Sequence, residues 1–228
     1  MTGGRRLPWG LIAAGVGAAA LIAALWLTPV AVRRVDVTGT RRLARAEVAR
    51  WTGVTPGARL TFAGARRIEA AMERLPALTK VTVMRGITGT LHVRVTERPP
   101  AAWLPRYGCA VAADGTLLPH LNRREPEWVG LDGFTAVRGA LTDSALFAEA
   151  LMLAKLVAVV GVGDAGVIRR VPGECWEWLT AGKRVRLSSP PAPQEAERLR
   201  RFREACPAAW ALAGRMDVRF RERVVVKP

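Results

Sequence analysis

The sequence of 228 residues predicts an α+β fold class: one transmembrane helix, then a β-α-α-β-β module, then a mainly antiparallel β domain with helices packed on it. Three observations predict this. An uncharged apolar run covers Leu7–Val32, strand and helix patterns follow over residues 33–99, and short strand patterns with frequent turns fill residues 100–228. Residues 1–6 would form a short tail ahead of the membrane-spanning helix.

The apolar run Leu7–Val32 is long enough to span a bilayer, which needs about 20 residues at 1.5 Å each. Trp9 and Trp26 would lie near the two interfaces, and Thr28-Pro29 would end the helix. A cleaved signal peptide is the alternative, but its apolar region is shorter, and "WLTPVAV" is a poor cleavage site. We favour an uncleaved anchor with a cytoplasmic N-terminus and the bulk of the chain outside.

The first module begins with a half-buried strand, because Val35 and Val37 alternate with polar residues before Gly39. Two amphipathic helices should follow, in "LARAEVARWTG" and in "AGARRIEAAMERL", which Pro76 ends. Two strands, "KVTV" and "LHVRVT", flank the hairpin loop "RGITG". Such a unit buries one sheet face under its helices and leaves the other face and an edge for a partner.

The second domain contains short strand patterns, helices and turns. The strand patterns are "AAWLP", "GCAVAA", "TLLP", "EWVGLDG", "GVIRRV", "CWEWLTA" and "KRVRLS". The helices are "DSALFAEALMLAKLVAVVG", capped by Asp143 or Ser144, and "PQEAERLRRFREAC". Asp114 and Asp132 precede glycines and indicate turns. A final strand is expected between Met216 and Val226, either central or at a sheet edge.

The charge and the cysteines indicate no enzyme, metal site or cofactor. The net charge of +16 is spread along the chain, which favours a solvated surface over nucleic-acid or lipid attraction. Cys109, Cys175 and Cys206 form no C-x-x-C pair and have no histidine near them in sequence. We expect buried thiols, with a Cys175–Cys206 disulfide as the alternative. The histidines and cysteines form no catalytic constellation.

From "VRRVDVTGTRRLARAEVARWTGV" to "VAADGTLLP", the chain resembles the bacterial division family FtsQ/DivIB. In that family the first module is a POTRA domain, and Glu97, Arg98, Pro99 and Trp103 match the pattern at the module's end. The tail "GRMDVRFRERVVVKP" is similar to the family's closing strands. The chain departs from the family at Ala77, where a bulky residue is common, and at Ile87-Thr88-Gly89, where an aromatic-Pro pair is common.

The resemblance implies a divisome scaffold at the septum of the cell inner membrane, which helps control peptidoglycan synthesis. FtsB/FtsL-type partners would add a strand to the sheet edge. The contact residues carried over by position are Arg219, Phe220, Glu222, Val224, Val225 and Val226. Phe220 as a plain core residue is the alternative. A second docking strand, for another division protein, would comprise Val35, Asp36, Val37 and Thr38, and FtsW/FtsI-type proteins are further expected partners of the chain.

Two other classes of function remain as alternatives. A POTRA-bearing transport or assembly component would show tandem POTRA repeats or amphipathic barrel strands. A membrane-tethered nucleic-acid binder would show a basic stripe with stacking aromatics, whereas the tryptophans here are scattered. We therefore expect the lipid bilayer, through Leu7–Val32, and division proteins as partners, with no specific nucleic acid and no small-molecule substrate.

Overall fold

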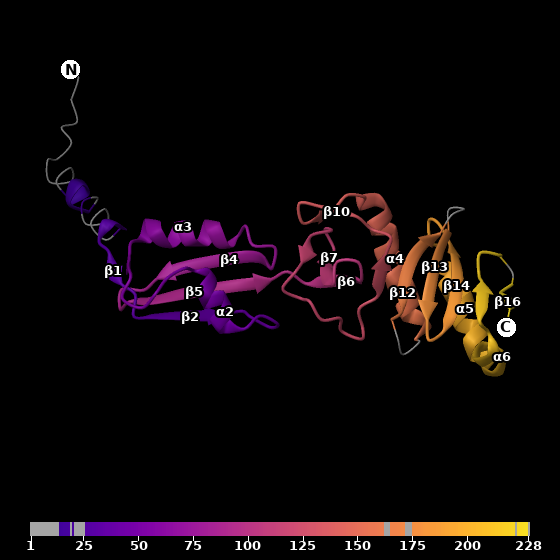
Figure 1. The fold of residues 1–228 in the computed structure, drawn as a ribbon. Helices are drawn as coiled ribbons and strands as arrows, with labels where there is room; N and C mark the ends of the chain where they lie inside the picture. The colour runs from indigo at the N-terminus through magenta and orange to yellow at the C-terminus, as the bar shows by residue number, and fades with distance from the viewer. Residues whose placement is uncertain are drawn as a thin grey trace, which may run out of the picture. The chain divides into compact units, whose positions relative to one another are not determined.

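A computed structural model describes residues 14–18, 20, 26–161, 165–171, 175–221 and 223–227 (Figure 1). The chain forms two compact units, unit 1 over residues 1–98 and unit 2 over residues 99–228, and both combine helices with sheet. Within the described ranges, no helix has both the length and the apolar character that crossing a membrane requires. Half of the predicted span Leu7–Val32, including Trp9, lies outside the described residues.

The C-terminal boundary of the predicted span is wrong. Val30–Ala31 form strand β1, which pairs antiparallel with β3 (Arg59–Leu60), and Val32 is buried in the core of unit 1. Helical structure ends at Leu27, so Thr28-Pro29 does stop the helix as expected. The apolar run passes from the predicted span into strand β1 and the buried Val32 without a charge between them, and composition alone could not separate the two.

Unit 1 has the predicted β-α-α-β-β order, with β1 and β3 added as a small separate sheet. Its main sheet has the order β2-β5-β4, in which β2 is parallel and β4 antiparallel to β5. Its elements are β2 (Arg34–Thr38), α2 (Arg45–Trp51), α3 (Phe62–Met72), β4 (Leu78–Arg85) and β5 (Thr90–Glu97).

The core of unit 1 follows the period-2 pattern of its strands. Leu91, Val93 and Val95 of β5 are buried, and alternate with residues that face the other side of the sheet. The helices contribute Val48 from α2 and Met72 from α3. Helix α3 ends at Met72, before the predicted end at Leu75, and turn hydrogen bonds then lead to Pro76. Because the helices pack on the face of the sheet that carries these buried residues, the opposite face is available for other contacts.

Unit 2 is built on a nine-stranded sheet of order β16-β15-β14-β13-β12-β9-β6-β7-β8. Most neighbours are antiparallel, but β6–β9, β9–β12 and β14–β15 are parallel. The strands are β6 (Pro100–Leu104), β7 (Cys109–Ala112), β8 (Leu117–Leu118), β9 (Gly130–Asp132), β12 (Val167–Val171), β13 (Cys175–Thr180), β14 (Lys183–Ser188), β15 (Arg215–Asp217) and β16 (Val225–Lys227), with a separate hairpin of β10 (Ala136–Val137) and β11 (Ala140–Leu141).

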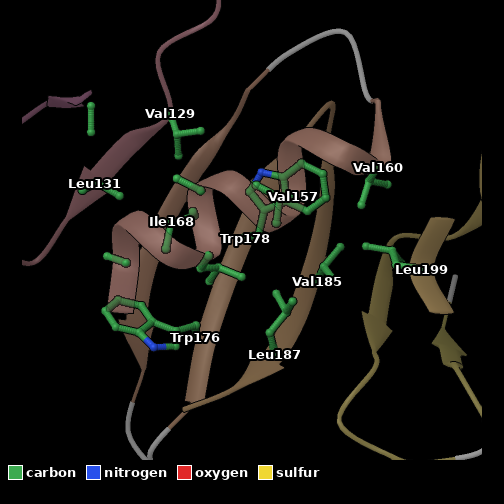
Figure 2. Close-up of a cluster of buried hydrophobic side chains, with 14 of the residues drawn as sticks. Val129, Leu131, Val157, Val160, Ile168, Trp176, Trp178, Val185, Leu187 and Leu199 are labelled. Carbon is green, nitrogen blue, oxygen red and sulfur yellow. The ribbon is translucent and has the colours of Figure 1, made fainter. Parts of the chain in front are cut away.

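The helices of unit 2 are α4 (Ser144–Val160), α5 (Pro193–Ala205) and α6 (Pro207–Leu212). The Asp143 side chain caps α4 by accepting the Leu146 amide, and Gly161 ends α4 in the left-handed conformation. Figure 2 shows Val157 of α4 and Leu199 of α5 gathered with Trp178 of the sheet in one core. The inner face of the sheet is thus covered.

The cysteines and turn aspartates have clear structural roles. Cys109 and Cys175 are buried thiols as expected, whereas Cys206 is an exposed thiol and forms no disulfide with Cys175. The expected burial of Cys206 is therefore wrong, because its thiol lies at the junction between α5 and α6, where it is exposed. Asp114 and Asp132 accept the amides of residues 116 and 133 within turns, as predicted.

Candidate functional site

Strand β16 forms one edge of the nine-stranded sheet. A single final strand between Met216 and Val226 was predicted, but the chain forms two strands, β15 and then β16, which is antiparallel to β15. Within the part of the chain that the structure describes, β16 pairs with β15 alone. An unpaired sheet edge presents backbone N–H and C=O groups that can bind an added strand.

The two faces of β16 differ in chemistry. Val226 pairs in register with Met216 of β15, which pairs with Val185 of β14, and this row belongs to the inner core. Val225 and Lys227 lie on the opposite, outer face, because side chains alternate along a strand. An added strand would therefore meet an apolar position on one face and a cation on the other.

The loop before β16 exposes an aromatic side chain. Phe220 is 42% exposed, so its alternative interpretation as a core residue is wrong. The Arg223 guanidinium carbon lies 5.6 Å from the centre of the Phe220 ring. Val224 is half-buried against the core, and Glu222 lies outside the described residues. Phe220 is thus presented next to the open edge, where an apolar partner group can reach it.

Arg219 is engaged within its own loop. Its guanidinium Nη2 lies 2.7 Å from Oδ2 of Asp217, and its Nε also donates to that carboxylate. Partial burial raises the pKa of Asp217, but hydrogen bonds from the side chain and backbone of Arg219 lower it more, so the net pKa lies below its usual range. Arg198 of α5 holds the same loop by donating to the Val218 carbonyl over 2.7 Å. Arg219 therefore positions the loop.

A row of alternating charges crosses the outer face of the sheet. In register from β9 to β15 stand Asp132, Arg169, Glu177, Arg186 and Asp217. The Glu177 side chain is 1% exposed and accepts from Arg169 Nη2 at 2.6 Å. This row was not predicted from the sequence. Its signal was the single glutamate in "CWEWLT" between the arginine-bearing patterns "VIRRV" and "KRVRLS".

A second row on the same face is cationic and reaches the edge. Arg184 of β14 pairs in register with Arg215 of β15, which pairs with Lys227 of β16. Arg184 and Arg215 also line an open hollow of about 460 Å³ near the β13–β14 turn. Opposite charges on adjacent strands attract one another, so the outer face beside β16 favours acidic side chains on an added strand.

Unit 1 also has an open edge, at the predicted docking strand β2. Val37 is buried and Val35 half-buried, whereas Asp36 and Thr38 are exposed on the other sheet face. Asp36 Oδ2 lies 3.6 Å from Nδ1 of His92, which is exposed as expected. A partner of β2 would contact its backbone edge, Asp36 and Thr38, because Val35 and Val37 pack into the core of unit 1.

The motif at the end of unit 1 fastens the backbone. The Glu97 carboxylate accepts the backbone amides of Arg41, Arg42 and Leu43 at 2.6–3.0 Å, and the charge of Arg42 also acts on it. Arg98 donates to the Pro76 and Leu78 carbonyls.

The other two residues of the predicted junction lie in unit 2. Pro99 is the first residue of that unit. Trp103 of β6 stacks on Trp128, with 6.5 Å between the ring centres. Each of the four residues thus has its described contacts inside its own unit: Glu97 and Arg98 in unit 1, and Pro99 and Trp103 in unit 2. Among the described residues, no group of three or more histidine, cysteine or carboxylate side chains is placed to hold a metal ion.

Comparisons with known proteins agree with this geometry. Residues 30–98 match the POTRA domain of FtsQ type. The cell division protein FtsQ of Rhodothermus marinus is 28% identical over 242 residues, which cover 99% of this chain and 89% of the relative. The cell division protein FtsQ of Streptomyces collinus is 33% identical over 105 residues, which cover 46% of this chain and 39% of the relative.

Proposed function

Because this chain belongs to the FtsQ/DivIB family of cell-division proteins, we propose that it is a non-enzymatic scaffold that binds other membrane proteins of the bacterial division machinery. The observation that carries this proposal is the open edge of β16, beside the exposed Phe220. Its partners are FtsB/FtsL-type proteins, and their recruitment to the septum helps control peptidoglycan synthesis there. No covalent step is involved.

Strand addition supplies the affinity. A partner segment pairs with the backbone of β16 and extends the nine-stranded sheet by one strand. Its inward side chains continue the apolar row of Met216 and Val226, while its outward side chains meet Lys227 and Arg215. Phe220 and the segment before β16 form an anchor at the side, in the manner of aromatic hot spots. The partner strand is thus apolar on one face and acidic on the other.

The membrane position follows from the apolar run. We place the span between Leu7 and Pro29, since residues 30–32 belong to unit 1. The short basic tail lies in the cytoplasm, and both units lie outside the membrane. The open edge of β2, with Asp36 and Thr38, is a second docking strand for a further division protein of FtsW/FtsI type.

The test is a pull-down from detergent-solubilised membranes with the full chain. The edge variant carries Phe220→Ala and Val225→Lys, which removes the aromatic anchor and places a charge on the edge strand. Its matched control carries Val137→Lys, at another exposed strand valine of unit 2. Far-UV circular dichroism and the melting midpoint show whether both variants stay folded.

We expect small single-span proteins with coiled-coil sequences to co-purify with the intact chain and the control, and to be reduced about tenfold or more with the edge variant. Retention of these proteins by a folded edge variant would contradict the assigned site and direct attention to β2. If no division protein co-purifies with any of the three chains, the scaffold function itself is wrong.

A further inference from the structure

Unit 1 carries an exposed apolar patch at the end where the chain enters it. Four large apolar side chains form this entry patch: Trp26, Leu27, Met84 and Ile87. Ile87 is 81% exposed and Leu27 is 71% exposed. Ile87 lies at the tip of the β4–β5 hairpin, and Trp26 and Leu27 shortly precede strand β1. Neither the core nor the docking edges of this chain use these side chains.

Hydrogen bonds fix the entering segment to the unit. Arg85 is buried, and its Nη1 donates to the Thr28 carbonyl over 2.7 Å. The Val32 amide donates to Ala58, and the Arg33 amide donates to the Gly89 carbonyl over 2.7 Å. The segment that follows the proposed span is therefore part of the folded unit, and the hairpin lies next to it. Figure 1 shows β1 beside the turn that joins β4 to β5.

The hairpin loop and the entering segment are in close contact. Gly89 has a φ of +86°, and a Cβ at this position would lie 2.6 Å from the Ala31 carbonyl oxygen. Trp26 packs against Phe62 with 5.6 Å between ring centres, and the Arg85 guanidinium carbon lies 4.2 Å from the Phe62 ring centre. These contacts fix Trp26, and the hairpin loop that carries Ile87, at one end of unit 1.

Cations surround the entry patch. Arg33 adjoins Gly89, Arg34 follows it in sequence, and Arg59 pairs in register with Ala31. All three arginines are exposed. None of them forms an ion pair within the ranges that the structure describes. The end of unit 1 nearest the proposed span thus combines exposed apolar side chains with available guanidinium groups.

We propose that this end of unit 1 seats on the lipid bilayer. Trp26 and Ile87 enter the interfacial region, and Arg33, Arg34 and Arg59 bind the phosphates of anionic phospholipids. This proposal rests on the span assigned above, whose end at Pro29 lies four residues before Arg33. Four residues reach at most about 14 Å. Tryptophans favour membrane interfaces, and arginines near anionic lipid add attraction.

A membrane partner fits better than a protein partner, because the patch is continuous with the apolar run that leads into it. The Gly89 carbonyl of the hairpin loop accepts a hydrogen bond from the Arg33 amide, so the loop stays close to the end of the span. The interfacial region of a bilayer is several ångströms thick on each side, which is enough for one exposed side chain at a hairpin tip. Seating would hold unit 1 in one orientation on the membrane.

The test uses the full chain in lipid nanodiscs, with Cys206→Ser to remove the exposed thiol. An environment-sensitive fluorophore is attached at Ile87→Cys, and the matched control carries it at Glu73→Cys. Glu73 is exposed at the other end of α3, close to the Pro76 and Leu78 region that binds Arg98. The eight residues of β5 separate the two ends of the sheet by about 26 Å. Lipids with a quencher high on the acyl chain report the depth of each fluorophore.

We expect quenching at residue 87 to exceed quenching at residue 73 about threefold in discs that contain phosphatidylglycerol. The double variant Arg33→Glu, Arg59→Glu should lower the quenching at 87 about twofold, and discs of phosphatidylcholine alone should do the same. The control pair Arg45→Glu, Arg74→Glu, at the other end of unit 1, should leave it unchanged.

Different outcomes overturn different claims. A chain that stays in the disc after size-exclusion chromatography, with equal and weak quenching at both positions, would overturn the seating while leaving the span in place. A chain that does not stay in the disc would overturn the span and the seating together. Quenching at 87 that arises only when a division protein is added would show a protein partner and also overturn the seating.

Discussion

At the scale of single residues, charged side chains of this protein often bind backbone groups. Glu69 of α3 accepts the Val83 amide at 2.7 Å, and Glu97 accepts three consecutive amides. Lys183 donates to the carbonyls of Ala211 and Ala213. Charge-assisted bonds to backbone groups fix the course of the chain where two elements meet. These residues therefore fix the course of the backbone, and a binding partner would contact other side chains.

Glu97 offers a direct test at this scale. Partial burial raises its pKa, but the amides of Leu43, Arg41 and Arg42 lower it more, so the net pKa lies below its usual value. A lowered folded-state pKa contributes stability above the unfolded value of about 4.3, which is lost as pH falls through the folded value. We expect Glu97→Gln to reduce the free energy of unfolding by about 1–2 kcal/mol at pH 7.

Urea unfolding at a series of pH values measures this effect. The difference between the intact chain and Glu97→Gln should shrink as the pH is lowered below about 4.3. Glu73→Gln, at the exposed end of α3, is the matched control and should unfold like the intact chain. An equal loss at every pH would show that the charge of Glu97 does not matter.

At the scale of elements, the two open edges differ from a protected one. Helix α3 packs beside β4, and its Glu69 occupies the Val83 amide. In the described parts of the chain, edge strand β8 also bonds outside its sheet, since the Leu117 amide donates to Gly139, whereas β2 and β16 have a strand on one side only. Protein edges are usually protected against chance pairing, so an open edge that also carries an exposed aromatic residue indicates a binding role. Of the two, β16 has the exposed Phe220 beside it.

The cationic row beside β16 predicts an effect of charge on partner binding. Arg215→Glu with Lys227→Glu reverses the outer face next to the edge. We expect the Kd for the FtsB/FtsL-type partner to rise about tenfold, which corresponds to about 1.4 kcal/mol, because acidic partner side chains would meet like charges. Titration calorimetry with the full chain in detergent measures it.

The control for this prediction carries Arg123→Glu and Lys155→Glu, which change the net charge equally at exposed positions elsewhere in unit 2. The control should bind like the intact chain. If both double variants weaken binding equally, the effect comes from the total charge and the row beside β16 has no special part in it.

The sequence predicts most of the helices and strands, but fewer of the contacts between them. The alternating valines of β2, β4 and β5 and the cap at Asp143 are local signals, and the structure confirms them. Val30–Val32 were assigned to the span because a short apolar strand that leads into the core and a membrane helix share apolar composition. The split of the tail into β15 and β16 depends on Asp217 and Arg219 closing a loop, a tertiary detail that periodicity does not encode.

The candidate site likewise combines residues that were predicted from the sequence with residues that were not. Phe220 and Val224–Val226 were predicted from position in the family pattern, and the structure places them at or beside one sheet edge. Glu177 and the cationic row of Arg184, Arg215 and Lys227 were missed, because they form only when strands far apart in sequence come into register. Long-range pairing of that kind leaves no local pattern.

At the scale of the whole molecule, the net charge of +16 has defined locations. Unit 1 presents Arg33, Arg34 and Arg59 around its entry patch, and unit 2 presents the cationic row beside its open edge. The first group suits anionic lipid and the second suits an acidic strand. Basic residues in this chain thus serve separate contacts, in addition to keeping the surface solvated.

Amide hydrogen exchange of the full chain, with and without the proposed FtsB/FtsL-type partner, tests directly whether a strand is added to β16. If the partner adds a strand to β16, exchange of the backbone amides of Val225–Lys227 should slow by roughly tenfold or more on binding. The β2 amides should keep their rates. Unchanged exchange at β16 in a complex that has formed would contradict strand addition at this edge.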